Sequence, residues 1–170
     1  MLAGQLQEIT TRRQLQPGDD AAIAELHRRV YQPEYGMNDE FVARVAEGAR
    51  RAIARGWPRT GGAVWLVERA GEPELAGSLA LTDEGDRRGQ VRWFVLVPEL
   101  RGQGLGRALL EQLLASARAA GMRRLELETF SALTSAAHLY REAGFRAVWE
   151  RERTDWGSPI TYQHYELELS

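Results

Sequence analysis

The segment best suited to hold a charged ligand is the glycine-rich run Arg-Gly-Gln-Gly-Leu-Gly at residues 101–106. It lies between an apolar run and a run whose leucines, at three- and four-residue spacing, predict an amphipathic helix. Glycines leave backbone N–H groups free of side-chain cover, and a helix N-terminus adds partial positive charge. The segment therefore predicts a loop that can hold a pyrophosphate. The alternative is a glycine-rich turn between a strand and a helix that binds no ligand.

A dinucleotide-binding loop is a competing interpretation of this segment. It requires the pattern G-x-G-x-x-G, but Arg107 or Leu109 stands where the third glycine would be, depending on the register. Glu126 does follow at about the distance of a ribose-binding acid. The first 90 residues, however, predict two helices followed by hairpins, whereas the dinucleotide fold needs an early loop and a second mononucleotide-binding half. This interpretation is therefore disfavoured.

Several kinds of catalytic chemistry are excluded by residue types that the sequence lacks. There is no cysteine, which excludes a disulfide framework, a thiolate nucleophile and Cys-ligated zinc. All 22 basic residues are arginine, which excludes a Schiff-base lysine, a lysine general base and a P-loop. His27, His138 and His164 lack metal-ligand spacing, so we expect them on a helix surface or a sheet edge. We predict no metal.

The elements that must position the glycine-rich run follow from hydrophobic periodicity and turn residues. Residues 17–20, Pro-Gly-Asp-Asp, predict a turn and N-cap cluster before a first helix that ends at about Val30. Residues 91–97 are apolar almost throughout, which predicts a strand buried on both faces. Helices are expected at about residues 20–30, 39–53, 105–120 and 133–143, and strands at 7–15, 63–68, 74–81, 90–97, 123–129, 145–153 and 160–169.

These elements predict an α/β fold with a central mixed, mainly antiparallel sheet of about seven strands flanked by about four helices. With 170 residues and no linker, the chain is expected to form a single domain, residues 1–170. A net charge of −2 gives no basic footprint for nucleic acid. With no signal-peptide core and no run long enough to span a membrane, we expect a cytoplasmic location and no membrane partner.

Two motifs resemble those of a known family. Arg101–Gly106 is similar to the acyl-CoA-binding signature of the GCN5-related N-acetyltransferases (GNAT), Gln/Arg-x-x-Gly-x-Gly/Ala. Residues 138–145, His-Leu-Tyr-Arg-Glu-Ala-Gly-Phe, resemble the family's L-Y-x-x-x-G-F segment, and 39 residues separate Arg101 from Tyr140. Other segments, such as Glu34-Tyr35-Gly36, look like the acetyltransferase domains fused to MarR-type regulators, here in a stand-alone form.

The resemblance implies direct transfer of an acetyl group from acetyl-CoA to a primary amine of a small molecule or a peptide. No covalent enzyme intermediate is involved, which agrees with the absence of cysteine. The resemblance assigns the backbone of Val95, Leu96 and Val97 to the pantetheine arm of acetyl-CoA. It assigns the pyrophosphate to Arg101, Gly102, Gln103, Gly104, Leu105, Gly106 and Arg107.

Two residues carry the implied acid and base chemistry. Tyr140 matches the tyrosine that protonates the departing CoA thiolate; the alternative is an aromatic residue that only packs at the helix start. Glu128 lies 12 residues before Tyr140, at the position of the base in the branch that acetylates ribosomal-protein N-termini. The alternative for Glu128 is a solvated strand residue paired with Arg123 or Arg124. An amine with a pKa of about 10.4 needs such a base at pH 7 more than an α-amino group does.

One position departs from the family pattern. An asparagine commonly stands seven residues before the tyrosine and contacts CoA, and here that position is Leu133. We therefore expect one polar contact to acetyl-CoA to be missing.

We expect aromatic and charged residues to line the pocket for the acceptor amine. These are Tyr31, Glu34 and Tyr35 from a loop, Arg92 and Trp93 from the central strand, and Trp156 or Tyr162 from the last hairpin. Such a lining suits a small amine or a peptide terminus. For each residue singly, the alternative is ordinary packing under long loops.

The sequence thus predicts an acetyl-CoA-dependent N-acetyltransferase that is a monomer or a homodimer. The alternative function is a non-catalytic CoA-binding sensor or interaction domain, which Leu133 and the two interpretations of Glu128 leave open. A winged-helix partner of DNA is disfavoured by the acidic charge balance.

Overall fold

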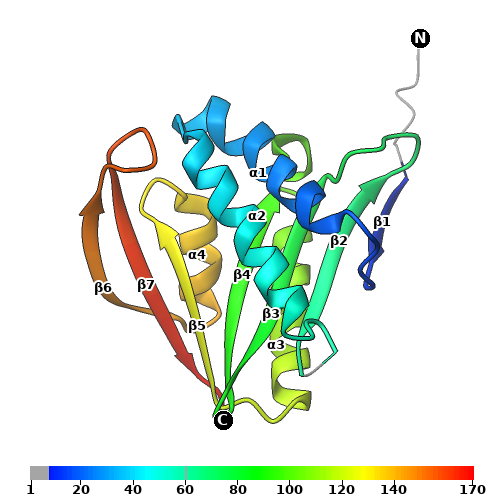
Figure 1. Cartoon of the computed structure of the whole chain (residues 1–170). Helices are drawn as coiled ribbons and strands as arrows, with labels where there is room; N and C mark the ends of the chain where they lie inside the picture. Colours follow the sequence, from blue (N-terminus) through cyan, green and yellow to red (C-terminus); the bar gives the residue numbers. More distant parts are fainter. Residues whose placement is uncertain (1–7, 60) are drawn as a thin grey trace.

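The computed structural model describes residues 8–59 and 61–170, which form one seven-stranded sheet with four α-helices (Figure 1). The helices are α1 (Asp19–Tyr35), α2 (Asp39–Ala54), α3 (Leu105–Ala119) and α4 (Thr134–Glu142), and a 3-10 turn covers Pro98–Leu100. The strands are β1 (Ile9–Arg12), β2 (Ala63–Arg69), β3 (Gly77–Gly85), β4 (Arg88–Leu96), β5 (Arg124–Phe130), β6 (Arg146–Arg153) and β7 (Ile160–Glu168). The predicted fold class is confirmed. Gln7, where the first strand was expected to begin, lies outside the described residues.

The strands follow the order β1-β2-β3-β4-β5-β7-β6. Neighbouring strands are antiparallel except β4 and β5, which run parallel. A parallel pair needs a crossover connection, and α3 supplies it. Helices α1 and α2 lie over one face of the sheet, and α3 and α4 lie over the other (Figure 1). None of the described helices combines the length and the apolar character that a membrane span requires.

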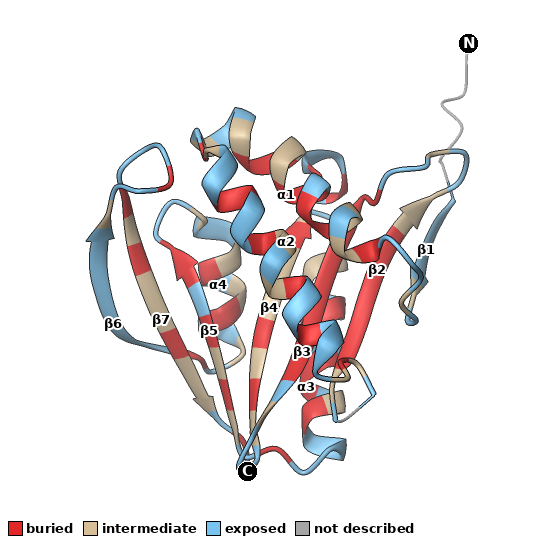
Figure 2. Ribbon diagram, in the orientation of Figure 1, coloured by how far each residue is buried: buried red, intermediate tan, exposed pale blue. Residues whose placement is uncertain are grey.

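The core is centred on β2 and β3, which have helices on both faces. β2 is buried from Ala63 to Val67 and β3 from Gly77 to Thr82 (Figure 2). β3 begins later than the predicted strand at 74–81 and continues to Gly85. β6, at one edge of the sheet, is exposed along nearly its whole length. The centre of the sheet is therefore a closed core, whereas the β5-β7-β6 side leaves one face open.

β4 and β5 separate soon after they begin to pair. Their register covers Arg88 with Arg124, Gly89 with Leu125 and Gln90 with Glu126. Within the described residues, no strand pairs with the β5 side of β4 beyond that point. The expectation that residues 91–97 are buried on both faces was wrong, because residues 92–94 and Leu96 are only half-buried where the strands diverge. The separation leaves room for a ligand at the centre of the sheet.

Helix α1 continues past its predicted end at Val30, so Tyr31, Glu34 and Tyr35 are helical and do not form a loop. Pro33 lies in this last part of the helix, where its missing N–H removes one helical hydrogen bond.

Aromatic packing stabilises the additional turn of α1. The ring of Tyr31 lies edge-on to Phe130 of β5, with 5.8 Å between ring centroids, and Tyr35 lies 5.4 Å from the same ring. Gly36 then ends the helix in a left-handed conformation, with φ of 67°. The sequence pattern missed this turn because its stabilising partner is nearly a hundred residues away in the chain.

The start of α1 lies within the predicted turn and N-cap cluster at residues 17–20. Gly18 is the N-cap and no side chain caps the helix. Asp19 instead accepts a hydrogen bond from the Gln16 backbone N–H at 2.6 Å and forms an ion pair with Arg12 at 2.7 Å. The carboxylate therefore ties α1 to β1.

Of the three histidines, His138 is exposed on α4 as expected. His164 lies on β7, inside the sheet between β5 and β6, so the expectation of a sheet edge was wrong. His27 is 4% exposed in α1, and its Nδ1 lies 2.7 Å from the Ile23 carbonyl oxygen. Burial lowers the pKa of His27 to about 4, against a smaller opposing effect of that hydrogen bond.

The lowered pKa of His27 predicts a specific pH dependence of stability. The unfolded chain takes up this proton first, so stability falls as the pH drops from about 6.5 towards 4. This group should lower the free energy of unfolding by about 1 kcal/mol between pH 7 and pH 5.5, measured by urea titration. His27→Leu should lose that dependence, and His138→Gln should keep it. Equal pH dependence in the wild type and His27→Leu would contradict the assignment.

Candidate functional site

The first candidate site is a cleft of about 610 Å³, here called the glycine-loop cleft. Its walls come from α1, the end of β4, the loop before α3 and the start of α4. The lining residues are Tyr31, Tyr35, Phe94, Val95, Leu96, Arg101, Gly102, Gly104, Gly106, Arg107, Leu133, Thr134, Ser135, Ala136, His138 and Leu139. Most residues predicted to bind the cofactor are among them, but Val97, Gln103 and Leu105 are not.

The glycine-rich loop presents free backbone donors to this cleft. Gly102 and Gly104 have left-handed φ angles of 75° and 84°, and a Cβ on either would meet no atom within 4 Å. Backbone conformation, and not crowding, therefore favours glycine at both positions. Gly104 is the N-cap of α3, and the first helical hydrogen bond runs from the Ala108 N–H to its carbonyl. The N–H groups of residues 105–107 have no partner in the described structure, which favours an anion there.

Gly106 has a different role from the other two glycines. A Cβ there would lie 3.3 Å from Leu139 Cδ1, 3.6 Å from Leu96 Cδ1 and 3.6 Å from Phe94 Cζ. The absence of a side chain lets the first turn of α3 approach both β4 and α4. These three elements form the walls of the cleft.

Both arginines predicted to contact phosphate form ion pairs. Arg101 Nη1 lies 2.9 Å from Glu34 Oε2, and Arg107 Nη1 lies 2.5 Å from Glu142 Oε2. Glu34, expected in the acceptor pocket, instead joins α1 to the glycine-rich loop. Both pairs are partly exposed, where such pairs contribute little stability. The N–H groups at the start of α3 are therefore the donors of this loop that no carboxylate occupies.

The start of α4 adds residues that sequence reasoning missed. Leu133 is the N-cap of α4 and offers no side-chain hydrogen bond to the helix. The loss of a polar contact to acetyl-CoA at this position stays a prediction. Missed lining residues are Phe94, Thr134, Ser135, Ala136, His138 and Leu139. The leucine-tyrosine motif located this helix, but no sequence signal identified which of its residues face the cleft.

A β-bulge lies on the part of β4 that has separated from β5. The pairing register shifts between Ser78 and Ala80, so that two residues, Trp93 and Phe94, oppose one residue of β3. Trp93 has φ of 51°, a left-handed conformation that costs about 1 kcal/mol or more outside glycine. The Ser78 hydroxyl donates to the Trp93 carbonyl at 2.5 Å and holds the bulge. The bulge redirects the β4 backbone where it borders the cleft.

A second cavity, the tyrosine pocket, has a volume of about 190 Å³ and adjoins the first, since Tyr31, Phe94 and Leu133 line both. Its lining residues are His27, Tyr31, Phe41, Arg44, Val45, Gln90, Val91, Arg92, Trp93, Phe94, Glu128, Thr129, Phe130, Leu133, Tyr140, Trp156 and Tyr162. The structure thus brings Tyr140 and Glu128, the predicted acid and base, to one pocket.

Tyr140 is 5% exposed and lies among aromatic rings. Its ring centroid is 6.2 Å from that of Phe94 and 5.8 Å from that of Phe145. Its hydroxyl has no hydrogen-bond partner among the described residues. Burial raises the pKa of Tyr140 above its ordinary value, so the phenol keeps its proton at neutral pH.

Glu128 accepts a hydrogen bond from the Tyr162 hydroxyl. Burial, followed by this hydrogen bond, raises the pKa of Tyr162. Among the described residues, neither Arg123 nor Arg124 pairs with Glu128, and Arg124 instead pairs with Glu168 at 2.8 Å. The arrangement leaves Glu128 facing the tyrosine pocket.

The residues predicted for the acceptor divide between the two cavities. Tyr35 lines the glycine-loop cleft, whereas Arg92 and Trp93 line the tyrosine pocket. Both hairpin alternatives, Trp156 and Tyr162, are also in the tyrosine pocket.

Sequence reasoning missed several polar residues of the tyrosine pocket, among them Arg44 and Thr129. The guanidinium of Arg44 lies 5.4 Å from the ring centroid of Trp156. The hydroxyl of Thr129 is buried without a hydrogen-bond partner. Nothing in the sequence distinguishes Arg44 from the other arginines of α2.

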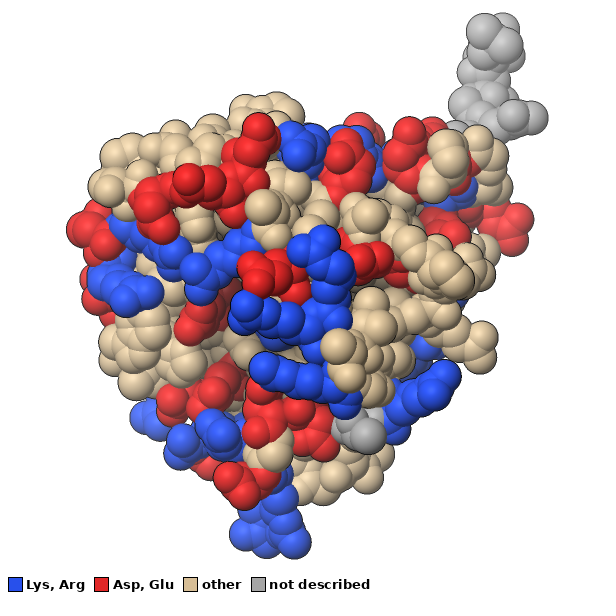
Figure 3. Space-filling model, in the orientation of Figure 1, with Lys and Arg blue, Asp and Glu red and all other residues tan. Residues whose placement is uncertain are grey.

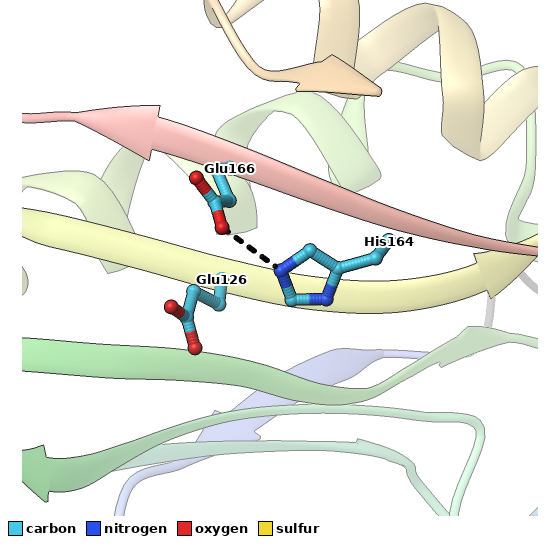
Figure 4. A group of neighbouring side chains, drawn as sticks. All are labelled: Glu126, His164 and Glu166. Atoms are coloured by element: carbon cyan, nitrogen blue, oxygen red, sulfur yellow. Dashed lines mark hydrogen bonds and ion pairs between the residues drawn. The ribbon is translucent and has the colours of Figure 1, made fainter. Parts of the chain in front are cut away.

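Three titratable side chains meet on β5 and β7, close to the tyrosine pocket (Figure 4). His164 Nε2 lies 3.2 Å from Glu166 Oε1, and Glu126 brings a third possible ligand atom to within 4.8 Å of both. Chain spacing missed the group because Glu126 comes from another strand. His164 also stacks on Trp149, and Glu126 lies 3.9 Å from Arg88, so the three residues already have protein partners. The absence of a metal stays a prediction.

Comparison with known proteins is consistent with this geometry. The model of the Acetyltransferase (GNAT) family matches residues 21–145. The uncharacterized N-acetyltransferase YjgM of Escherichia coli K12 is 31% identical over 137 residues, which cover 80% of this chain and 81% of YjgM.

Solved structures share the fold at low sequence identity. A GNAT-family acetyltransferase from Staphylococcus aureus Mu50 has a TM-score of 0.71 and 16% identity, covering 96% of this chain and all of the other. YncA of Salmonella typhimurium, a putative acetyltransferase solved with acetyl-CoA, has a TM-score of 0.65 and 20% identity, covering 96% of this chain and 95% of YncA. The family-model match over most of the chain, with the YjgM similarity, shows that this chain belongs to the GNAT family of acetyltransferases.

Proposed function

We propose that the protein transfers the acetyl group of acetyl-CoA to the nitrogen of a primary amine carried by a small molecule or a peptide. The observation that carries the proposal is the unpaired edge of β4, which runs between the glycine-rich loop and the pocket of Tyr140 and Glu128. An extended ligand arm can add to such an edge through backbone hydrogen bonds. The family to which the chain belongs supports acetyl transfer.

The residues of the glycine-loop cleft fit the two parts of acetyl-CoA that need binding. The free N–H groups at the start of α3 suit the pyrophosphate, since they combine donors with the positive end of the helix dipole. The open edge of β4 at Val95 and Leu96 suits the pantetheine arm, which carries amide groups. Its path along β4 leads towards the tyrosine pocket, so the thioester would lie near the acceptor.

The tyrosine pocket supplies groups for the proton transfers. The amine nitrogen forms a bond to the thioester carbon, the carbon–sulfur bond breaks, and the sulfur leaves with the bonding electron pair. The Tyr140 hydroxyl donates its proton to that sulfur, and the proton lost by the amine passes to the Glu128 carboxylate. Exchange with solvent then restores both groups. Holding the two substrates together supplies much of the acceleration.

A non-catalytic CoA-binding domain is the less favoured alternative. Leu133 removes one polar contact to CoA, but it leaves the free N–H groups and the open strand edge in place. A sensor would have no need for a buried phenol without a partner beside an exposed carboxylate.

Tyr140→Phe tests the acid. The change keeps the ring that packs against Phe94 and Phe145 but removes the proton donor, so kcat should fall about 100-fold or more. Thiol release from acetyl-CoA measures the rate. Tyr165→Phe is the matched control. It removes the hydroxyl of a buried tyrosine whose ring packs near that of Tyr140, and Tyr165 lines neither cavity. Full turnover in Tyr140→Phe would remove this residue from the mechanism.

Glu128→Gln tests the base. With an alkylamine of pKa about 10.4, kcat/KM at pH 7 should fall about 100-fold, and the loss should be smaller with an α-amine of pKa about 8. Glu126→Gln, two residues away on the same face of β5, should leave both rates unchanged. If the pH–rate profile of Glu128→Gln overlays that of the wild type, Glu128 is not the general base.

Gly104→Ala tests the anion site. The left-handed φ at this position resists any Cβ, and a shifted loop would misplace the N–H donors. Calorimetry should therefore show Kd for CoA raised about tenfold. Gly121→Ala is the control: Gly121 lies just beyond the other end of α3, with φ of 76° and equally open space. Both variants should lose about 1 kcal/mol of stability, and an equal Kd for CoA in the two would speak against the site.

A further inference from the structure

A third cavity adjoins the tyrosine pocket and is lined by four arginines. This arginine pocket has a volume of about 500 Å³ and lies between α2 and the β3–β4 hairpin. Arg44, Arg51 and Arg55 reach it from α2, and Arg92 reaches it from β4. Figure 3 shows basic side chains gathered over the α2 region on the same face of the molecule, with acidic side chains beside them.

The arginine pocket also carries three carboxylates, so its four arginines leave a small excess of positive charge. Glu47 forms an ion pair with Arg51 at 2.5 Å. Glu84 accepts a hydrogen bond from the Thr82 hydroxyl at 2.7 Å, and Asp83 accepts one from the Gly85 N–H at 2.9 Å.

Three of the four guanidinium groups have no ion-pair partner. In the part of the chain that the structure describes, no carboxylate lies within 4 Å of the guanidinium of Arg44, Arg55 or Arg92. Three of the four positive charges therefore lack a carboxylate partner, although Arg44 and Arg92 lie over the rings of Trp156 and Trp93.

Arg92 is the most informative of these residues because it is half-buried. Its guanidinium lies 4.7 Å from the ring centroid of Trp93, and a Cβ on Gly48 would come within 3.1 Å of its Nη2. It is thus held between the bulge of β4 and α2. Burial lowers the pKa of Arg92, and nearby Arg55 acts in the same direction, while Glu84 and Glu128 oppose them. A half-buried guanidinium that no carboxylate contacts gains from a direct anionic partner, and an anionic ligand would supply one.

The arginine pocket is also connected to the chemistry. Arg44, Gln90 and Arg92 line both the arginine pocket and the tyrosine pocket. A molecule that presents its amine to Glu128 can therefore extend its other end past Arg92 towards Arg55. The guanidinium fork matches the oxygen atoms of a carboxylate or a phosphate and binds them through two parallel hydrogen bonds.

We propose that the arginine pocket binds an anionic group of the acceptor, so that the preferred substrate is an amine that also carries a carboxylate or a phosphate. Arg92 and Arg55 are the specificity-determining residues, and Arg44 extends the same surface into the tyrosine pocket. This inference rests on the proposed acetyl transfer and narrows its acceptor class.

The test compares matched acceptors that differ only in the anionic group. The carboxylate pair is an ω-amino acid and its amide, and the phosphate pair is an aminoalkyl phosphate and the corresponding amino alcohol. The wild type should favour the anionic member in kcat/KM by about 10- to 100-fold, mainly through KM. The pair with the larger preference identifies the group that the pocket takes. No preference in either pair overturns the proposal.

Substitutions in the arginine pocket test whether its residues cause the preference for anionic acceptors. Arg92→Gln and Arg55→Gln should each reduce the ratio of kcat/KM for anionic and neutral acceptors about tenfold or more, and Arg92→Lys should restore part of it. Arg50→Gln is the control, since Arg50 is exposed on α2 and lines none of the three cavities. A preference that neither glutamine variant reduces overturns the proposal.

A binding measurement separates failure of the pocket from failure of the proposed function. Calorimetry with the ω-amino acid and with inorganic phosphate, each in the presence of saturating CoA to occupy the glycine-rich loop, needs no turnover. Binding that Arg55→Gln weakens and Arg50→Gln keeps would support the pocket even if no amine is acetylated. If neutral amines are acetylated and all variants bind the anion equally, the proposed acetyl transfer is supported. The same result would contradict the proposal that the arginine pocket binds an anionic group.

Discussion

The early separation of β4 from β5 is the constraint on which the rest of the site depends. After the pairing of Gln90 with Glu126, the β4 backbone continues with one edge unpaired. A sheet normally satisfies such groups with the next strand, and a buried unpaired backbone group is expensive. Here the gap between the strands becomes a cleft, so the groups face solvent or a ligand. The glycine-loop cleft and the tyrosine pocket both border this gap.

Aromatic rings pack on both sides of the gap. Tyr31 and Tyr35 of α1 pack on Phe130, at the end of β5, while Tyr140 of α4 packs near Phe94 of β4. These rings line the two cavities that border the gap. The bulge at Trp93 adds a second irregularity at the same place. Tyr140 therefore has two roles. Its ring packs beside the gap, and in the proposed mechanism its hydroxyl faces the reacting atoms.

Local sequence patterns were sufficient for the element order, the α/β class and the glycine-rich loop, because periodicity and turn residues act over short distances. The resemblance to the GNAT family pointed to Tyr140 and Glu128, which the structure brings to one pocket. Features that depend on distant contacts were missed: the last turn of α1, held by Phe130; the burial of His27; and the arginine pocket, which joins α2 to a hairpin. No glycine marks the bulge at Trp93, so its left-handed backbone left no signal in the sequence. The narrower resemblance to MarR-fused domains stays a prediction.

The exposed edge strand β6 has a consequence for how the molecule avoids unwanted association. Open strand edges can recruit another chain and extend the sheet into an aggregate, and charged residues on an edge oppose this. β6 carries Arg146 and then four consecutive charged residues, 150–153, along its exposed length. At the opposite edge, β1 is only four residues long within the described chain. The charges of β6 and the shortness of β1 thus oppose strand pairing at the outer edges, although Val148 and Trp149 of β6 are exposed. The inner edge of β4, in contrast, borders the two cavities and can accept an added strand-like segment.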